Sequence, residues 1–124
     1  MDSKAQEHFS EGKRKLQEAN QELYKPMEDV VSFVVCRNTL SAIENYLKGY
    51  LELRGFETNS GESIEELMER CRSLNKKFRE VKIETIDCRA SNPENKYCEE
   101  VNKVNSCFNT ADHLDSFLRK NKIL

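Results

Sequence analysis

A long apolar segment, residues 27–55, constrains this chain more than any other feature: MEDVVSFVVCRNTLSAIENYLKGYLELRG. Its second half has apolar residues at three- and four-residue spacing, which is typical of a helix. Its first half contains VVSFVV at 30–35, which is rich in β-branched residues and would suit a strand on propensity alone. Because no turn signal separates the halves, we expect one helix from about Pro26 to Arg54, ended by Gly55. A helix this apolar must be wrapped by other helices.

Three further amphipathic segments provide those partners. Their approximate ranges are 4–24, 63–78 and 93–121. Gly12, within the apolar stripe of the first, could allow a close approach of another helix. Ser63 and Glu66 form a Ser-x-x-Glu capping box at the start of the next. The pattern weakens after Phe78, where an extra short helix could form around 79–88. These features predict an all-α, up-and-down four-helix bundle with one domain spanning residues 1–124.

Composition excludes several classes of protein. The net charge of −2 gives no global attraction to nucleic acid or to an anionic membrane. The chain begins without an apolar signal core, and no later run reaches the roughly 18 uncharged residues of a membrane span. We therefore expect a cytoplasmic protein with no membrane partner. The five cysteines have no CxxC or CxxH spacing, so we interpret them as reduced, mostly buried side chains and expect neither a metal site nor a cofactor.

Three segments, in their order along the chain, suggest a family. They are AIENYLKGYLELRG at 42–55, SIEELMERC at 63–71 and ADHLDSFLRKN at 111–121. Together with the amphipathic first helix, this order resembles the HEPN domains, small helical proteins often encoded beside minimal nucleotidyltransferases in bacteria and archaea. The resemblance covers nearly the whole chain. It implies a helical bundle that forms a homodimer.

The resemblance also bears on activity, because many HEPN domains are ribonucleases. Their motif is an Arg followed, after about four to six residues, by a His, which lets the His move a ribose hydroxyl proton while the Arg steadies phosphate charge. This sequence departs from that motif. No Arg precedes His8, the nearest Arg before His113 is Arg89, and no His follows Arg37-Asn38. The resemblance therefore implies a non-catalytic binding or regulatory module, such as a toxin–antitoxin component acting with a nucleotidyltransferase, RNA or a nucleotide.

Three polar residues of the long helix are candidates for ligand binding: Arg37, Glu44 and Lys48. Glu44 and Lys48 lie four residues apart with Glu first, the favourable order for a helical ion pair. A local ion pair is the simpler interpretation, and a polar cluster that touches a ligand between helices is the functional one.

A second candidate surface is basic. Arg72, Lys76 and Arg79 would share one face of a continuous helix and could bind nucleic acid. Acidic residues are interleaved with them, however, so a solvated face is the simpler interpretation. Phe78, the aromatic residue within this stretch, belongs to the apolar stripe and would not stack on bases.

Two other functions stay open at this point. One is a divergent metal-independent ribonuclease that uses Arg37 or Arg89 with a folded-in His113. RNA cleavage that disappears on His113→Ala would favour it. The other is a helical protein-interaction module with no nucleic-acid role, and salt-dependent RNA binding would argue against that.

Overall fold

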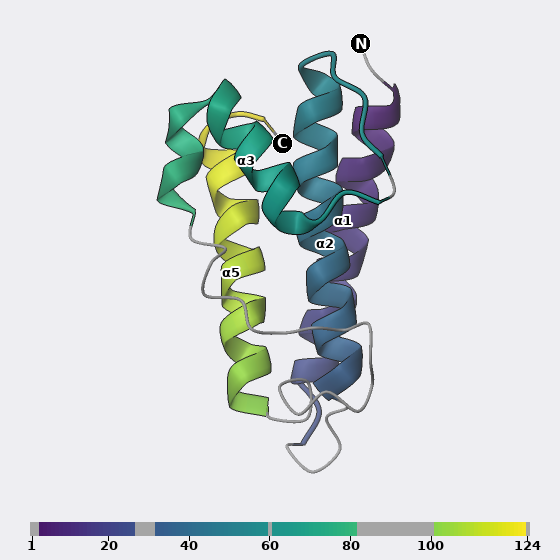
Figure 1. Cartoon of the computed structure of the whole chain (residues 1–124). Helices are drawn as coiled ribbons and strands as arrows, with labels where there is room; N and C mark the ends of the chain where they lie inside the picture. The colour runs from purple at the N-terminus through teal and green to yellow at the C-terminus, as the bar shows by residue number, and fades with distance from the viewer. Residues whose placement is uncertain (1–2, 27–31, 60, 82–100, 124) are drawn as a thin grey trace.

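The computed structural model describes residues 3–26, 32–59, 61–81 and 101–123 (Figure 1). Its elements are α1 (Ser3–Leu23), α2 (Ser32–Leu53), α3 (Ile64–Leu74), the short 3-10 helix η2 (Lys76–Glu80) and α5 (Val101–Lys120). Within these described ranges every regular element is helical, so the predicted all-α bundle is confirmed. None of the described helices is long and apolar enough to cross a membrane.

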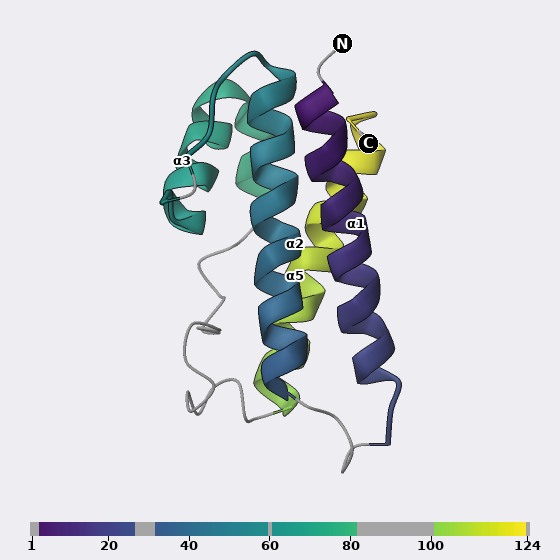
Figure 2. The same ribbon diagram turned by 90° about the vertical axis from the view of Figure 1, so that its right-hand side faces the viewer.

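The central position of α2 organises the bundle. It contacts α1, α3 and α5, as a helix this apolar requires. Figures 1 and 2 show α1 running antiparallel along α2, while α5 runs in the same direction as α2. The α3–η2 unit packs beside the C-terminal half of α2 and the end of α5. The start of α1, the end of α2 and the end of α5 therefore meet at one end of the bundle.

Both ends of the predicted long helix can be compared with α2. Residues 32–35 are helical, so the strand alternative is wrong for them, and residues 27–31 lie outside the described ranges. At the other end Gly55 has a φ of 87°, which a residue without Cβ adopts at little cost. The Gly55 N–H donates to Glu52 O at 3.0 Å and the Phe56 N–H donates to Leu51 O at 3.0 Å. This confirms the predicted glycine stop.

The contact between α1 and α2 depends on two glycines. A Cβ on Gly12 would lie 2.8 Å from carbons of the Tyr46 ring, and a Cβ on Gly49 would lie 2.7 Å from carbons of the Phe9 ring. Each helix thus offers a glycine to an aromatic ring of the other. The close approach expected at Gly12 is confirmed.

The third predicted helix is shorter than expected. The Ser63–Glu66 capping box is present, with the Glu66 N–H donating to Ser63 Oγ at 3.1 Å. The helix ends at Leu74 because Asn75 is extended and its side chain accepts from the Lys77 N–H, which starts η2. Phe78 falls in η2, not in α3. The extra short helix expected around 79–88 overlaps η2 at 79–80, and residues 82–88 lie outside the described ranges.

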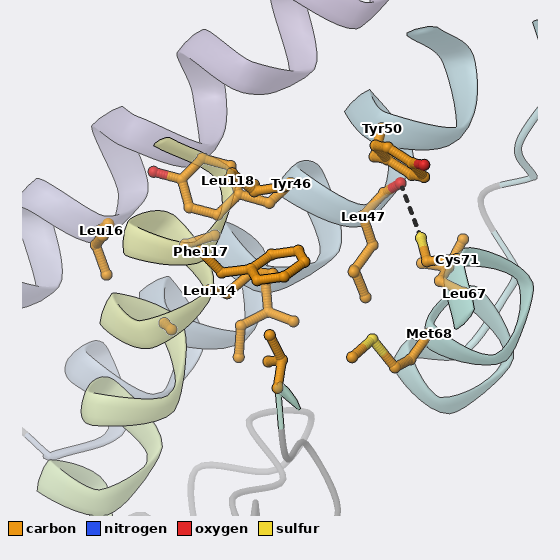
Figure 3. Packing of buried hydrophobic residues seen from close by; sticks show 14 of the residues in the cluster. Leu16, Tyr46, Leu47, Tyr50, Leu67, Met68, Cys71, Leu114, Phe117 and Leu118 are labelled. Atoms are coloured by element: carbon orange, nitrogen blue, oxygen red, sulfur yellow. Dashed lines mark hydrogen bonds between the residues drawn. The ribbon is translucent and has the colours of Figure 1, made fainter. Parts of the chain in front are cut away.

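One hydrophobic cluster joins these helices, and Figure 3 shows part of it. Leu47 of α2 lies between α5 and α3 in this view. The Phe78 ring packs against Tyr50 and Phe117, with centroids 4.6 and 4.9 Å apart, and so attaches η2 to both α2 and α5. The start of the last helix, predicted near residue 93, lies outside the described ranges.

Candidate functional site

The predicted polar residues of α2 lie on its less buried side. Lys48 Nζ is 2.8 Å from Glu44 Oε1, so the expected ion pair is present. The Lys48 side chain is only 12% exposed, whereas that of Glu44 is 37% exposed. Arg37 is exposed near the start of α2, and its guanidinium lies 5.7 Å from the centre of the Phe33 ring. The simpler interpretation of the Glu44–Lys48 pair therefore accounts for its geometry, and ligand binding stays a prediction.

Lys48 also lies near a second ionic contact, which joins Glu57 and Glu62 to Arg70 of α3. Arg70 Nη1 donates to both carboxylate oxygens of Glu62 at 2.7 Å, and Arg70 Nη2 donates to Glu57 O at 2.9 Å. The hydrogen bond from Arg70 lowers the pKa of Glu62, helped by the Asn59 N–H and by the charge of Lys48. These polar contacts hold a loop in place and require no ligand.

The three basic candidates do not lie on one continuous helix. Arg72 is on α3, whereas Lys76 and Arg79 are on η2 beyond the break at Asn75. Arg72 is partly buried and its Nη2 donates to Val81 O at 2.9 Å, which makes it a structural contact. Lys76 and Arg79 are exposed. A nucleic-acid surface here would therefore depend on Lys76 and Arg79.

A buried polar cluster joins α2 to α5, and helical periodicity alone did not predict it. The Tyr46 hydroxyl donates to Asp115 Oδ2 at 2.5 Å, and Arg119 Nε donates to Asp115 Oδ1 at 2.5 Å. Burial raises the pKa of Tyr46, and the hydrogen bond to Asp115 adds to the shift. Tyr46 is fully buried and Asp115 is 8% exposed. The cluster fixes the Tyr46 ring against Gly12 of α1.

A second feature that periodicity missed lies where α1 begins and α2 ends. His8 Nδ1 contacts Glu52 Oε1, and the Glu52 side chain is only 7% exposed. This contact is favourable when Nδ1 carries a proton, because Nδ1 can then donate to the carboxylate. Glu52 also lines a pocket of about 390 Å³. Helical spacing could not reveal this pair, because the two residues come from different helices and Glu52 belongs to a charged helix end.

The other histidine has a different setting. His113 is exposed on α5 and lines a depression of about 210 Å³ with Ser116, Lys120 and Glu80 among its neighbours. Since the Tyr46–Asp115 bond fixes the register of the parallel helices α2 and α5, Arg37 lies about seven residues out of register with His113. That offset corresponds to about 10 Å along the axis. Arg89 lies outside the described ranges.

The cysteines correct one expectation. Cys71 and Cys107 are buried thiols outside any disulfide, as predicted, and the Cys71 thiol donates to Leu47 O at 3.7 Å (Figure 3). Burial raises the pKa of Cys71 to about 12. Cys36, however, is disulfide-bonded, so the expectation that all five are reduced is wrong. Spacing along the chain cannot show which cysteines meet in the fold. Among the described residues, no group of three or more His, Cys, Asp or Glu side chains is arranged to hold a metal ion.

Comparisons with family models, with curated proteins and with solved structures give no match to this chain. The HEPN resemblance therefore stays a prediction from the sequence segments quoted above.

Proposed function

We propose that this protein is a non-catalytic HEPN-like module that binds or regulates a nucleotidyltransferase or a nucleic acid. The support for the family assignment is the order of the three sequence segments at 42–55, 63–71 and 111–121. Exposed basic groups on η2, Lys76 and Arg79, are available for such a partner. The proposal also assigns ligand contacts to Arg37, Glu44 and Lys48 of α2.

The observation that carries the non-catalytic part is the setting of the two histidines. His8 contacts the Glu52 carboxylate at one end of the bundle, while His113 lies exposed beside Lys120 on α5. Neither has an Arg at the family spacing before it in the sequence. We therefore expect single-stranded RNA to stay intact when incubated with the purified protein. Cleavage that is lost on His113→Ala would contradict this part and favour the ribonuclease alternative.

The nucleic-acid part can be tested through Lys76 and Arg79, which are exposed on η2. We expect RNA affinity to fall with salt, and the double variant Lys76→Glu/Arg79→Glu to reduce the slope of log affinity against log salt by about 1.4 if both contact phosphate. Fluorescence anisotropy with a labelled single strand measures this. Lys13→Glu, an exposed lysine on α1, is the control. Equal effects of the two variants would favour an interaction module without an RNA role.

The partner and the assembly state need separate tests. We propose a homodimer, which light scattering would distinguish from a monomer. Co-purification with a nucleotidyltransferase encoded by an adjacent gene would support a toxin–antitoxin role. Failure of that pair to associate would restrict the proposal to nucleic acid.

A cytoplasmic location is part of the proposal, and the disulfide at Cys36 weighs against it because stable disulfides are rare in the reducing cytosol. A thiol count on protein isolated without reductant decides the matter. The disulfide takes two of the five cysteines. A denatured sample should therefore show two fewer reactive thiols than a reduced sample if the bond forms in the cell. Equal counts would support the reduced state.

A further inference from the structure

The pocket that lies where α1 begins and α2 ends has the composition of a binding site. Gly55 ends α2, and residues 55–58 line this pocket together with Lys4 from the start of α1. The pocket between them has a volume of about 390 Å³, within the range of small-molecule sites. The residues that line it are Lys4, Glu52, Gly55, Phe56, Glu57 and Thr58.

Charge on the pocket wall favours a cation. Two carboxylates, Glu52 and Glu57, face a single ammonium group, Lys4. Glu52 is the unusual member because its side chain is 7% exposed, and a buried carboxylate strongly favours a charged donor beside it. Its contact with His8 uses one of its two oxygens. Glu52 also lines the pocket, so its carboxylate can accept from a donor bound there in addition to His8.

The remaining wall suits an organic cation better than a metal ion. Phe56 is 45% exposed although it is a large apolar side chain, and an aromatic ring beside carboxylates attracts alkylammonium groups. The Thr58 hydroxyl adds one neutral acceptor. A small primary amine could donate to Glu52 and lay its carbon chain against Phe56.

We propose that this pocket binds a small primary alkylammonium ion, with Glu52 as its main acceptor and Phe56 as its apolar contact. Lys4 is then a competing cation at the edge of the site. This site is independent of the nucleic-acid and partner contacts proposed above.

Two probes of similar size and opposite charge, butylammonium and butyrate, test the proposal at constant pH. Chemical-shift titration of backbone amides gives the affinity and the place of binding. We expect butylammonium to shift the amides of 55–58 and to bind more tightly than butyrate. Equal or tighter binding of butyrate, or shifts confined to another part of the protein, would overturn the proposal.

Variants that remove one charge then show whether the pocket prefers a cation or an anion. Glu52→Gln should weaken butylammonium binding about tenfold or more, whereas Lys4→Gln should tighten it about twofold to fivefold. An anion site would reverse both signs, and a site for a zwitterion would weaken with both variants, so either pattern contradicts a cation site. Glu69→Gln and Lys13→Gln make the same charge changes at exposed positions away from the pocket and should leave the affinity unchanged.

The buried position of Glu52 requires a second route in case Glu52→Gln does not fold. Phe56→Leu changes an exposed ring and should lower the affinity about twofold to fivefold by removing the cation–π contact. An unchanged affinity in Phe56→Leu, together with no tightening in Lys4→Gln, would overturn the proposal without Glu52.

Discussion

The α1–α2 pair and the α3–η2 unit are attached to the same bundle by different means. In the α1–α2 pair, Gly12 and Gly49 bring two backbones together so that Tyr46 and Phe9 fit against them. The α3–η2 unit buries Leu67, Met68 and Cys71 of α3 and Phe78 of η2 in the core. Its arginines make polar contacts with the neighbouring segments, from Arg70 to Glu62 and from Arg72 to Val81 O. The first contact depends on a close backbone approach, whereas the second combines buried side chains with partly exposed polar contacts.

This difference indicates how each region should respond to change. A close backbone approach has no room for adjustment, so one added methyl group must move a buried ring. Partly exposed ion pairs exchange with water and contribute little each. We therefore expect one substitution in the α1–α2 contact to lower the free energy of unfolding much more than one substitution in the polar contacts of the α3–η2 unit.

The largest effect should follow Gly49→Ala or Gly12→Ala. The new Cβ would lie 2.7 Å from the Phe9 ring or 2.8 Å from the Tyr46 ring, and both rings are buried. Overpacking costs about 1–3 kcal/mol, and the better helix propensity of Ala recovers at most about 1 kcal/mol. We expect a net loss in the free energy of unfolding, measured by urea denaturation.

Gly61 provides the matched control, because a Cβ added there would meet no atom within 4 Å and its φ is not in the left-handed range. Gly61→Ala should be neutral or slightly stabilising. The smaller side chain of Phe9→Leu should recover part of the loss in Gly49→Ala but none of it in Gly12→Ala. Equal stability of Gly49→Ala and Gly61→Ala would mean that shape does not control the α1–α2 contact.

Tyr46→Phe should have the next largest effect, since it removes the donor to Asp115 Oδ2, while Arg119 still donates to Oδ1. We expect a loss of about 1–3 kcal/mol near neutral pH. The pKa of Tyr46 is raised in the folded protein, so the stability from its protonated hydroxyl is present below the unfolded pKa of about 10 and is lost as pH rises above it. The difference in the free energy of unfolding between wild type and Tyr46→Phe should therefore become smaller as the pH rises above about 10.

Tyr50→Phe is the control, because the Tyr50 hydroxyl accepts from the exposed Arg54 side chain at 2.9 Å. The difference in the free energy of unfolding between wild type and Tyr50→Phe should be smaller than that for Tyr46→Phe at every pH. A constant gap for Tyr46→Phe across the alkaline range would show that its hydroxyl does not titrate with unfolding.

The sequence predicted the α1–α2 pair better than it predicted the α3–η2 unit. The stripes of α1 and α2, the glycine at 12 and the stop at Gly55 all follow from periodicity within one helix, and each is present. The end of α3 was misjudged because the apolar step to Phe78 continues in the sequence while Asn75 turns the backbone to an extended conformation. Local propensity at one residue decided that boundary.

The candidate site was harder to predict because its members come from distant parts of the chain. Glu44–Lys48 was found since both residues lie on one helix. Tyr46 with Asp115 and His8 with Glu52 were not, because each pair joins two helices whose register the sequence does not state. The only signal was Asp115 beside Leu114 at an apolar position of the last stripe, where a carboxylate needs a donor when buried.

The smallest effect should follow Glu62→Gln, which removes the charge that Arg70 holds. We expect a loss of at most about 1 kcal/mol, too small to resolve well by global unfolding.

Cys71 offers a local measurement: its thiol is buried between α3 and α2, and its pKa of about 12 suppresses reaction at mildly alkaline pH unless α3 opens. Its alkylation rate, read by peptide mass spectrometry, should rise about twofold to fivefold in Glu62→Gln and stay unchanged in Glu69→Gln, whose side chain is exposed on the same helix. Because the pKa of Glu62 is lowered in the folded protein, this tie should be present above the unfolded pKa and lost as pH falls through the folded value. An unchanged alkylation rate in Glu62→Gln would mean that buried side chains such as Leu67, Met68 and Phe78 hold the α3–η2 unit without help from Glu62. Polar contacts would then play no part in the contrast with the α1–α2 pair.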